Sequence, residues 1–571
     1  MKINSSIKRI LGDLPMTAEA YWLIRQKGGP LSKSFSFSRL EQALPDWCEQ
    51  ARNAASKNST RNISNPIKKI LLFSTLRYWI EHSTLMSLAL AGSGHDVTLA
   101  FLPYANWWRD LSRFDIRRQN AYASKVLGLA SPTIRILPLF NYQSTYSQNS
   151  SESALPVELV AAIREVSTRD TQYTLQIEEI FGGDRKSEAR KLFDLRMERN
   201  QQAAMALINW MEESTPEKQP DIIITPNGSI LEMGAIFQTA RFLKIPVVTY
   251  EFGEQRGRIW FDLNREAMLQ DTTEMWQAYK KSSFSMEEKN QIRDLYTSRQ
   301  NASLWKNFGR LWQEQPALGG NITRQNLALD SRPVALLAAN VIGDSLTLGR
   351  QVFTRNMSDW LEQIIKIFAK KQDVQFVIRV HPGERYTKGP SVAMLVRNLL
   401  PEIPEHFRLI EAESSMNTYD LIEISDLGLV YTTTVGLEMA MSGIPVIVAG
   451  KTHYRDKGFT LDPDSWESLS EHLEKTISDP RANKLTSDQV ENAWHYAYCF
   501  FFEYPCPFPW HRRDFWKKIE VWPIEKTLSE DGLAIFGDTF RYLTGEPRVW
   551  DRKFSYKNFD KTDGYSAVSD N

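Results

Sequence analysis

Arg379, His381 and Glu384 close the segment Val374–Glu384, which begins as an apolar run with several β-branched residues. Such a run predicts a buried parallel strand, and that strand would bring the three side chains to the rim of a sheet. Ligands of open α/β sheets bind just beyond the carboxyl ends of the strands. A histidine held before Pro382 can donate a hydrogen bond to a phosphate oxygen and stabilise a leaving nucleotide. The alternatives are a rim histidine with a structural partner and an arginine that only pairs with Glu384.

Three consecutive threonines, Thr432, Thr433 and Thr434, follow a second apolar run that starts at Asp426. A helix is expected to begin near residue 435, and hydroxyls together with N–H groups at a helix N-terminus bind anions. One threonine is enough for an N-cap, so three indicate a phosphate ligand, with plain capping as the alternative. Glu438, early in that helix, either binds ribose hydroxyls or only complements the helix dipole.

A third polar cluster, His453, Lys457 and Thr460, follows another predicted strand. Contact with a sugar or a phosphate is expected, and a solvated loop is the alternative. The nearby Asp462-Pro-Asp464 resembles the Asp-x-Asp metal motif of some sugar transferases. Its proline and the suitability of Asp464 as a helix N-cap favour a structural role, so no required metal is expected.

Candidates for a general base come from loops that would face the space between two domains. Glu251 is the best placed because it ends a predicted strand, although an inter-domain ion pair is an equal alternative. Glu81 and His82 also follow a predicted strand. Asp344, in the first loop of the second domain, is a further candidate, and capping the next helix is its alternative.

The elements that would position these residues show an internal echo. The order strand, polar turn with glycine, helix, Ile-Pro, strand occurs at 221–251 and again at 426–450. Two such units predict an α/β fold with two Rossmann-like domains that face a cleft. The expected organisation is an N-terminal extension and linker (1–66), an N-terminal Rossmann-like domain (67–262) with a helical insertion at about 105–215, a helical connection (263–330), a C-terminal Rossmann-like domain (331–490) and an aromatic-rich extension with a disordered end (491–571). Within the linker, 55–66 is expected to be flexible.

Composition excludes several classes of protein. The 571 residues are too many for one core, and 42% hydrophobic with 24% charged residues is ordinary for a globular protein. Lys+Arg and Asp+Glu both number 69, so no global charge favours nucleic acid. The three cysteines lack metal-ligand spacing, and no apolar stretch approaches the roughly 18 residues of a spanning helix. Gly92 and Gly94 end a helix before a strand, which is the wrong order for nicotinamide or flavin binding. The protein is expected to be cytoplasmic and to need no cofactor.

Several of these motifs resemble the bacterial capsule polysaccharide biosynthesis family. The matching stretches are 379–384, 432–438 and 443–450, with 227–228 and 250–253 as looser matches. That family includes transferases of 3-deoxy-manno-octulosonic acid (Kdo) and is similar to sialyltransferases that share a His-Pro and a Ser/Thr motif. The resemblance implies a GT-B fold, an acceptor on the N-terminal side and a CMP-activated sugar donor bound mainly by the second domain, with the two motifs around the nucleotide phosphate. The insertion and the long tail are not explained by it.

The expected function is therefore metal-independent transfer of a sugar, an acidic one from a CMP-sugar, to a growing surface or capsular polysaccharide. The acceptor would be a saccharide or a lipid-linked saccharide. The alternatives are a nucleotide-sugar epimerase of the same fold, a glycerophosphate-type transferase and a non-catalytic polysaccharide assembly protein. The aromatic segment 498–510 is expected to pack on the domains; the alternative is peripheral association with the inner face of the cell membrane, since Trp and Tyr favour interfaces.

Overall fold

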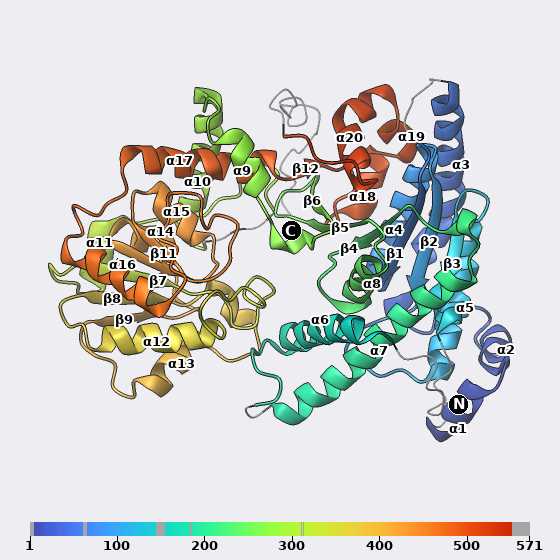
Figure 1. The fold of residues 1–571 in the computed structure, drawn as a ribbon, viewed down its shortest axis with the longest axis horizontal. Helices are drawn as coiled ribbons and strands as arrows, with labels where there is room; N and C mark the ends of the chain where they lie inside the picture. Colours follow the sequence, from blue (N-terminus) through green and yellow to red (C-terminus); the bar gives the residue numbers. More distant parts are fainter. Residues whose placement is uncertain are drawn as a thin grey trace.

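Two α/β lobes lie side by side in the computed structural model (Figure 1). It describes residues 5–60, 66–143, 155–182, 185–309, 311 and 313–550, and within them one lobe has a seven-stranded sheet and the other a five-stranded sheet. This confirms the predicted GT-B-like arrangement of two Rossmann-like domains. No helix of these described ranges is long and apolar enough to cross a membrane.

The N-terminal sheet has the strand order β12-β6-β5-β4-β1-β2-β3. Strands β1 to β5 are parallel, and β6 and β12 add an antiparallel edge. The strands are β1 (Lys69–Thr75), β2 (Asp96–Leu102), β3 (Arg135–Pro138), β4 (Ile222–Pro226), β5 (Val247–Phe252), β6 (Arg258–Leu263) and β12 (Cys506–Pro507).

The C-terminal sheet is entirely parallel, with the order β11-β10-β7-β8-β9. Its strands are β7 (Val334–Ala338), β8 (Gln375–Arg379), β9 (Phe407–Ile410), β10 (Leu427–Val430) and β11 (Val446–Val448). In each sheet the order in which successive strands are added reverses at the first strand. The switch points therefore lie between the parallel neighbours β1 and β4 and between β7 and β10. Open α/β sheets bind ligands beyond the carboxyl ends of the strands at such switch points.

Helices cover both sheets. Those of the N-terminal lobe are α1 (Ser5–Asp13), α2 (Thr17–Ile24), α3 (Ser38–Thr60), α4 (Arg77–Gly92), α5 (Arg113–Leu127), α6 (Val157–Leu175), α7 (Lys186–Glu213) and α8 (Leu231–Phe242), joined by α18 (Phe515–Val521), α19 (Ile524–Thr527) and α20 (Glu530–Leu543) from the end of the chain. Those of the C-terminal lobe are α9 (Thr273–Tyr279), α10 (Met286–Gln300), α11 (Gly320–Asn326), α12 (Met357–Ala369), α13 (Val392–Leu399), α14 (Thr418–Glu423), α15 (Val435–Met441), α16 (Trp466–Ser478) and α17 (Ser487–Tyr498).

The echo in the sequence corresponds to the units β4-α8-β5 and β10-α15-β11. In each unit an aspartate precedes the first strand and holds the start of the central strand beside it. The carboxylate of Asp221 accepts a hydrogen bond from the Lys69 amide at 2.7 Å, and that of Asp426 accepts one from the Val334 amide at 3.0 Å. The two domains therefore share this aspartate hydrogen bond as well as the order of their elements.

Parts of the first half differ from the sequence-based expectation. The insertion is not purely helical, because β3 within it extends the N-terminal sheet beyond β2. Helix α3 continues to Thr60, so residues 55–60 are helical where a flexible join was predicted, and residues 61–65 lie outside the described ranges. Phe37, Leu44 and Trp47 are buried in the core of the N-terminal lobe. The segment before β1 is thus part of that core.

The end of the chain returns to the first domain. After α17 it crosses back, β12 pairs with β6, and Trp510, Phe536 and Phe540 are buried in the N-terminal core. Figure 1 shows the red helices α18–α20 beside the blue α3. The rings of Phe500 and Phe501 are also buried, which corrects the idea that this segment presents its aromatic groups to a membrane. The predicted disordered end falls on residues 551–571, outside the described ranges.

The segment that follows α6 reaches the other domain. The Glu178 carboxylate accepts hydrogen bonds from the amides of Met357 and Ser358 at 3.0 and 2.9 Å, at the start of α12. The Gln176 side-chain oxygen accepts one from the Lys388 amide at 3.0 Å. The insertion therefore joins the two lobes at a point far from the chain connection between them.

Candidate functional site

The switch point of the C-terminal sheet carries the threonine cluster and one residue that sequence reasoning missed. Asn340 follows β7, and its side-chain oxygen accepts hydrogen bonds from the amide and the hydroxyl of Thr432 at 3.1 and 3.3 Å. The Thr433 carbonyl accepts a hydrogen bond from the Tyr454 hydroxyl at 2.5 Å. These contacts fix the loop after β10 at the edge where a ligand of this sheet would lie. The signal for Asn340 was a polar side chain directly after an apolar strand.

His381 lies at the end of the next strand, β8, and is half-buried. Its Nδ1 accepts a hydrogen bond from the Gly383 amide at 3.0 Å. A neutral ring that accepts at Nδ1 carries its proton on Nε2. In this tautomer His381 therefore carries a donor at Nε2, beside the strand next to the switch point.

Arg379 and Glu384 are engaged by the protein itself. The Arg379 guanidinium donates to the Glu411 carbonyl at 2.7 Å and to the Ser414 carbonyl at 3.3 Å, and burial lowers its pKa to about 10. The buried Glu384 carboxylate accepts from the Ser391 hydroxyl at 2.9 Å and from the Val392 amide at 3.1 Å, at the start of α13. Arg379 does not pair with Glu384, which was the alternative to a phosphate contact, and both side chains hold loops beside β8.

Glu438 belongs to an inter-domain ion network rather than to an open edge. Its carboxylate accepts hydrogen bonds from Arg299 at 2.7 Å and from the Tyr419 hydroxyl at 2.8 Å, and it is buried. Arg299 also pairs with Glu254, in the loop after β5, at 3.1 Å. Arg299, which sequence reasoning did not single out, thus links the C-terminal domain to a loop of the first domain.

The third predicted cluster packs inward. The His453 ring is buried, stacks on Phe500 with centroids 3.6 Å apart and shares a hydrogen bond of 3.0 Å with the Tyr496 hydroxyl. Burial lowers its pKa well below the usual value, so it stays neutral. The Lys457 ammonium is half-buried and lies 3.5 Å from the Thr273 hydroxyl. The buried packing of His453 differs both from the expected sugar or phosphate contact and from the alternative of a solvated loop.

Glu251 ends β5 beside the switch point of the N-terminal sheet. Its carboxylate accepts hydrogen bonds from the Asn227 side-chain amide at 2.8 Å and from the Phe252 amide at 3.0 Å. Burial raises its pKa, and these hydrogen bonds and the charge of Arg512 partly oppose the rise. A carboxylate with a raised pKa and fixed orientation is suited to act as a general base.

Glu251 and Asp344 come from different domains and act on the same tyrosine. Burial raises the pKa of Tyr173, and the charges of Asp344 and Glu251 raise it further while Arg512 lowers it. The Asp344 carboxylate accepts a hydrogen bond from the Ser345 hydroxyl at 3.1 Å, and Asn356 instead caps α12. Tyr173, near the end of α6, is thus within the electrostatic influence of predicted site residues from both domains.

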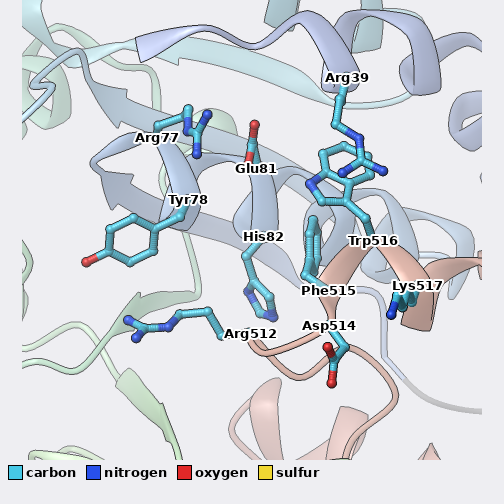
Figure 2. A pocket seen from close by; sticks show the side chains of 10 residues that line it. All are labelled: Arg39, Arg77, Tyr78, Glu81, His82, Arg512, Asp514, Phe515, Trp516 and Lys517. Atoms are coloured by element: carbon cyan, nitrogen blue, oxygen red, sulfur yellow. The ribbon is translucent and has the colours of Figure 1, made fainter. Parts of the chain in front are cut away.

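A pocket of about 420 Å³ opens beside this region at the start of α4 (Figure 2). It is lined by Arg39, Arg77, Tyr78, Glu81, His82, Arg512, Asp514, Phe515, Trp516 and Lys517. Burial lowers the pKa of His82 to about 3, and its ring nitrogens contact the Tyr250 hydroxyl at 3.2 Å and the Trp510 carbonyl at 3.1 Å. His82 is therefore a neutral packing residue, whereas Glu81 faces the pocket.

The raised pKa of Glu81 makes the free energy of unfolding depend on pH. Burial raises its pKa from 4.5 to about 7, against the lowering effect of Arg77 and Arg39. The folded state therefore binds this proton more tightly than the unfolded state, and stability is lost as pH rises through this interval. We expect Glu81→Gln to raise the free energy of unfolding by about 1–3 kcal/mol at pH 8 and to leave it nearly unchanged at pH 4.5. Urea unfolding at both pH values measures this; an equal effect at the two would contradict it.

No group of three His, Cys, Asp or Glu side chains in the described part of the chain is placed to hold a metal ion. Asp462 accepts hydrogen bonds from the Asp456 amide at 3.0 Å and the Thr460 hydroxyl at 2.8 Å, and Ser465, not Asp464, caps α16. Asp462 therefore stabilises the loop before α16.

Comparison with known proteins gives distant structural neighbours only. No model of a protein family matches the chain, and no curated protein matches it. Solved structures that resemble it include a β-Kdo 2,4-transferase, KpsC of Thermosulfurimonas dismutans, at 16% identity and a TM-score of 0.33, covering 51% of this chain and 82% of that one. A UDP-GlcNAc 2-epimerase of Neisseria meningitidis matches at 14% identity and a TM-score of 0.23, covering 76% and 99%. The wall teichoic acid polymerase TagF matches at 11% and 0.19, covering 81% and 95%.

Proposed function

We propose that the chain is a glycosyltransferase that takes an acidic sugar from a CMP-activated donor and transfers it to a saccharide or lipid-linked saccharide of a surface polysaccharide. The observation that supports this most is that the charges of Glu251 and Asp344, which come from different domains, both raise the pKa of Tyr173. Transfer between two substrates requires such a shared space, with the donor at one switch point and the acceptor at the other.

In this proposal the C-terminal switch point holds the donor phosphate. The His381 Nε2–H and the hydroxyls of Thr433 and Thr434 donate to its oxygens, whereas the Thr432 hydroxyl donates to Asn340 and holds the loop in place. The acceptor hydroxyl loses its proton to the Glu251 carboxylate, and its oxygen forms a bond to the anomeric carbon. The bond from that carbon to the phosphate oxygen breaks, and the electron pair stays on the nucleotide, where His381 stabilises the growing charge. Asp344 orients the acceptor from the opposite side.

A donor panel distinguishes this function from its alternatives. The protein is incubated with CMP-sialic acid, CMP-Kdo, UDP-GlcNAc and CDP-glycerol, and thermal shift and product analysis are recorded for each. Binding and acceptor-dependent consumption of a CMP-sugar is the expected result. Conversion of UDP-GlcNAc to an isomer without acceptor would indicate an epimerase, and consumption of CDP-glycerol a glycerophosphate transferase. A folded protein that binds none of the four would leave the role of a non-catalytic assembly protein.

Removing the hydrogen bond that His381 would donate to the phosphate should reduce turnover more than it reduces the stability of the fold. A hydrogen bond to a charged group contributes about 1.5–3 kcal/mol, so His381→Ala should lower turnover of the CMP-sugar by roughly tenfold to a hundredfold. Because leaving-group charge grows in the transition state, kcat should fall as well as affinity. Thr433→Val should act in the same direction. Full specific activity in both variants, with a lower Tm in His381→Ala, would return these residues to loop capping.

A further inference from the structure

Four exposed cationic side chains line the pocket at the start of α4, and we call this the basic pocket. They are Arg39 of α3, Arg77 of α4, Arg512, and Lys517 of α18. In the part of the chain that the structure describes, no ion pair joins any of these four to a carboxylate. The remaining aspartate of the lining, Asp514, is paired with Arg256 at 3.3 Å.

Two of the cations are held in place by aromatic rings. The Arg39 guanidinium lies 4.7 Å from the centre of the Trp516 ring, and that of Arg512 lies 5.2 Å from the centre of the Tyr78 ring. Stacking of this kind fixes a guanidinium and leaves its N–H groups available in the plane. The pocket therefore presents oriented donors, whereas a solvated basic surface would leave them flexible.

Glu81 lines the pocket between Arg77 and Arg39. Its side chain is only 6% exposed, and no described residue forms a hydrogen bond with its carboxylate. Figure 2 shows it pointing between Arg77 and the Arg39–Trp516 pair. A buried polar group without a protein partner, aimed into a cavity, indicates a ligand that supplies the missing contact.

We propose that the basic pocket binds an oxyanion carried by the acceptor, either the carboxylate of an acidic sugar or the phosphate of a lipid carrier. This inference rests on the proposed function, because it places the acceptor on the N-terminal domain. The pocket follows β1, at the switch point of that sheet, and its volume of about 420 Å³ lies in the range usual for small-molecule sites. Its walls come from α3 and from residues 512–517, so the two ends of the chain build it together.

The charge of the basic pocket changes between pH 6 and pH 8 because of one group. The other ionisable side chains that line the pocket are those of Arg39 on α3, Arg77, Tyr78 and His82 on α4, and Arg512, Asp514 and Lys517 on the C-terminal segment. His511 is near Arg512 and is considered with them. Arginine and lysine are charged throughout this range, His82 and His511 are neutral with pKa values of about 3 and 4, and the pKa of Tyr78 is raised above 10 by burial. Glu81, with a pKa raised to about 7, becomes neutral as pH falls. Anions should therefore bind more tightly at pH 6 than at pH 8.

Direct binding tests the proposal without any need for turnover. The full chain is titrated calorimetrically at low salt with a hyaluronan hexasaccharide, with inorganic pyrophosphate and with chitohexaose, a neutral oligosaccharide of equal length. We expect at least one anionic probe to bind roughly tenfold or more tightly than chitohexaose. Preference for hyaluronan assigns the site to a sugar carboxylate, and preference for pyrophosphate assigns it to a phosphate. Equal binding of all three probes would overturn the proposal.

Charge reversal within the pocket supplies the matched comparison. Arg77→Glu and Lys517→Glu should weaken the preferred anionic probe by roughly tenfold or more. The control is Arg52→Glu, at an exposed arginine of α3 that lies 13 positions, about 20 Å, from Arg39 along the helix. Equal losses in the control and in the pocket variants would reject a specific site. Melting temperatures of all variants verify that each is folded.

The pH dependence gives an independent readout. The carboxylates of hyaluronan stay ionised between pH 6 and pH 8, so a gain in its affinity on acidification reports a group of the protein. We expect a gain of roughly threefold to tenfold in the unmodified chain. Glu81→Gln should bind at pH 8 as the unmodified chain does at pH 6. A gain that persists in this variant would contradict the role of Glu81. A chain that binds the probes but transfers no sugar would refute the proposed function and keep the oxyanion site.

Discussion

Glu251→Gln should lower turnover of the preferred nucleotide sugar by about 10²- to 10⁴-fold, the contribution usual for a general base. Glutamine keeps the shape of the side chain and can still accept hydrogen bonds, but it cannot take the proton of the acceptor hydroxyl. The loss should fall on kcat with little change in donor affinity, because the donor site that we propose is on the other domain. The measurement is steady-state turnover with a CMP-sugar and a saccharide acceptor, beside donor binding by calorimetry.

Asp262→Asn is the matched control for this substitution. Asp262 lies on β6, opposite Thr249 of β5, and burial raises its pKa to about 6. Its pKa is thus raised like that of Glu251, but its charged neighbours are Arg265, Asp271 and Glu274, and its charge is not among those that act on Tyr173. Turnover should be unchanged in Asp262→Asn. If Glu251→Gln were as active as this control, Glu251 would be an oriented structural carboxylate and another group would take the proton.

Arg196→Met should destabilise the fold by about 3–5 kcal/mol, since it leaves two buried carboxylates without their cation. Arg196 of α7 is fully buried and lies 3.1 Å from Asp170 of α6 and 2.9 Å from Glu232 of α8. Asp170 also accepts a hydrogen bond from the Leu231 amide at the start of α8. Methionine nearly fills the space, so the effect measures the lost charge rather than a cavity. Urea unfolding monitored by circular dichroism gives the free energy of unfolding.

An exposed pair on the same helix shows what a surface ion pair contributes. Arg190 and Asp194 lie 3.1 Å apart with side chains 62% and 58% exposed. Arg190→Met should change the free energy of unfolding by less than about 0.5–1 kcal/mol. If Arg196→Met cost no more than this, the buried network would not be what fastens the insertion to the N-terminal sheet.

The sequence was informative where local rules act alone. Buried parallel strands appear in the sequence as apolar runs. The strand that precedes His381 and the strand that contains Glu251 were therefore placed within a few residues. The repeated Asp-strand-helix-Ile-Pro-strand pattern correctly predicted two Rossmann-like domains. It could not show that β12, two residues long, would pair with β6 more than 240 positions earlier, because such a pairing has no local signal.

Side-chain partners were the least predictable feature. Glu438 lies in a motif typical of ligand-binding residues, yet its carboxylate accepts a hydrogen bond from Arg299, 139 positions earlier. His453 follows a strand like a site residue, yet the ring of Phe500 covers it. The pocket beside α4 combines Arg39 with Lys517, from the two ends of the chain. Such pairings depend on tertiary contacts, whereas the type of element depends mainly on neighbours in sequence.

During translation, the N-terminal domain cannot complete its core until nearly the whole chain has left the ribosome. Its edge strand β6 lacks a partner until β12 is made, and its core is incomplete until the buried rings of Trp510 and Phe540 are added. Domains otherwise tend to fold in the order of their synthesis. Here the second domain, which has its own sheet and core, is made in full before the first is finished. Nascent chains should therefore expose the unfinished β6 edge to chaperones while the roughly 240 residues between β6 and β12 are made. A chain cut after Tyr504, which keeps the aromatic residues of the second core, should fail in its first domain rather than its second.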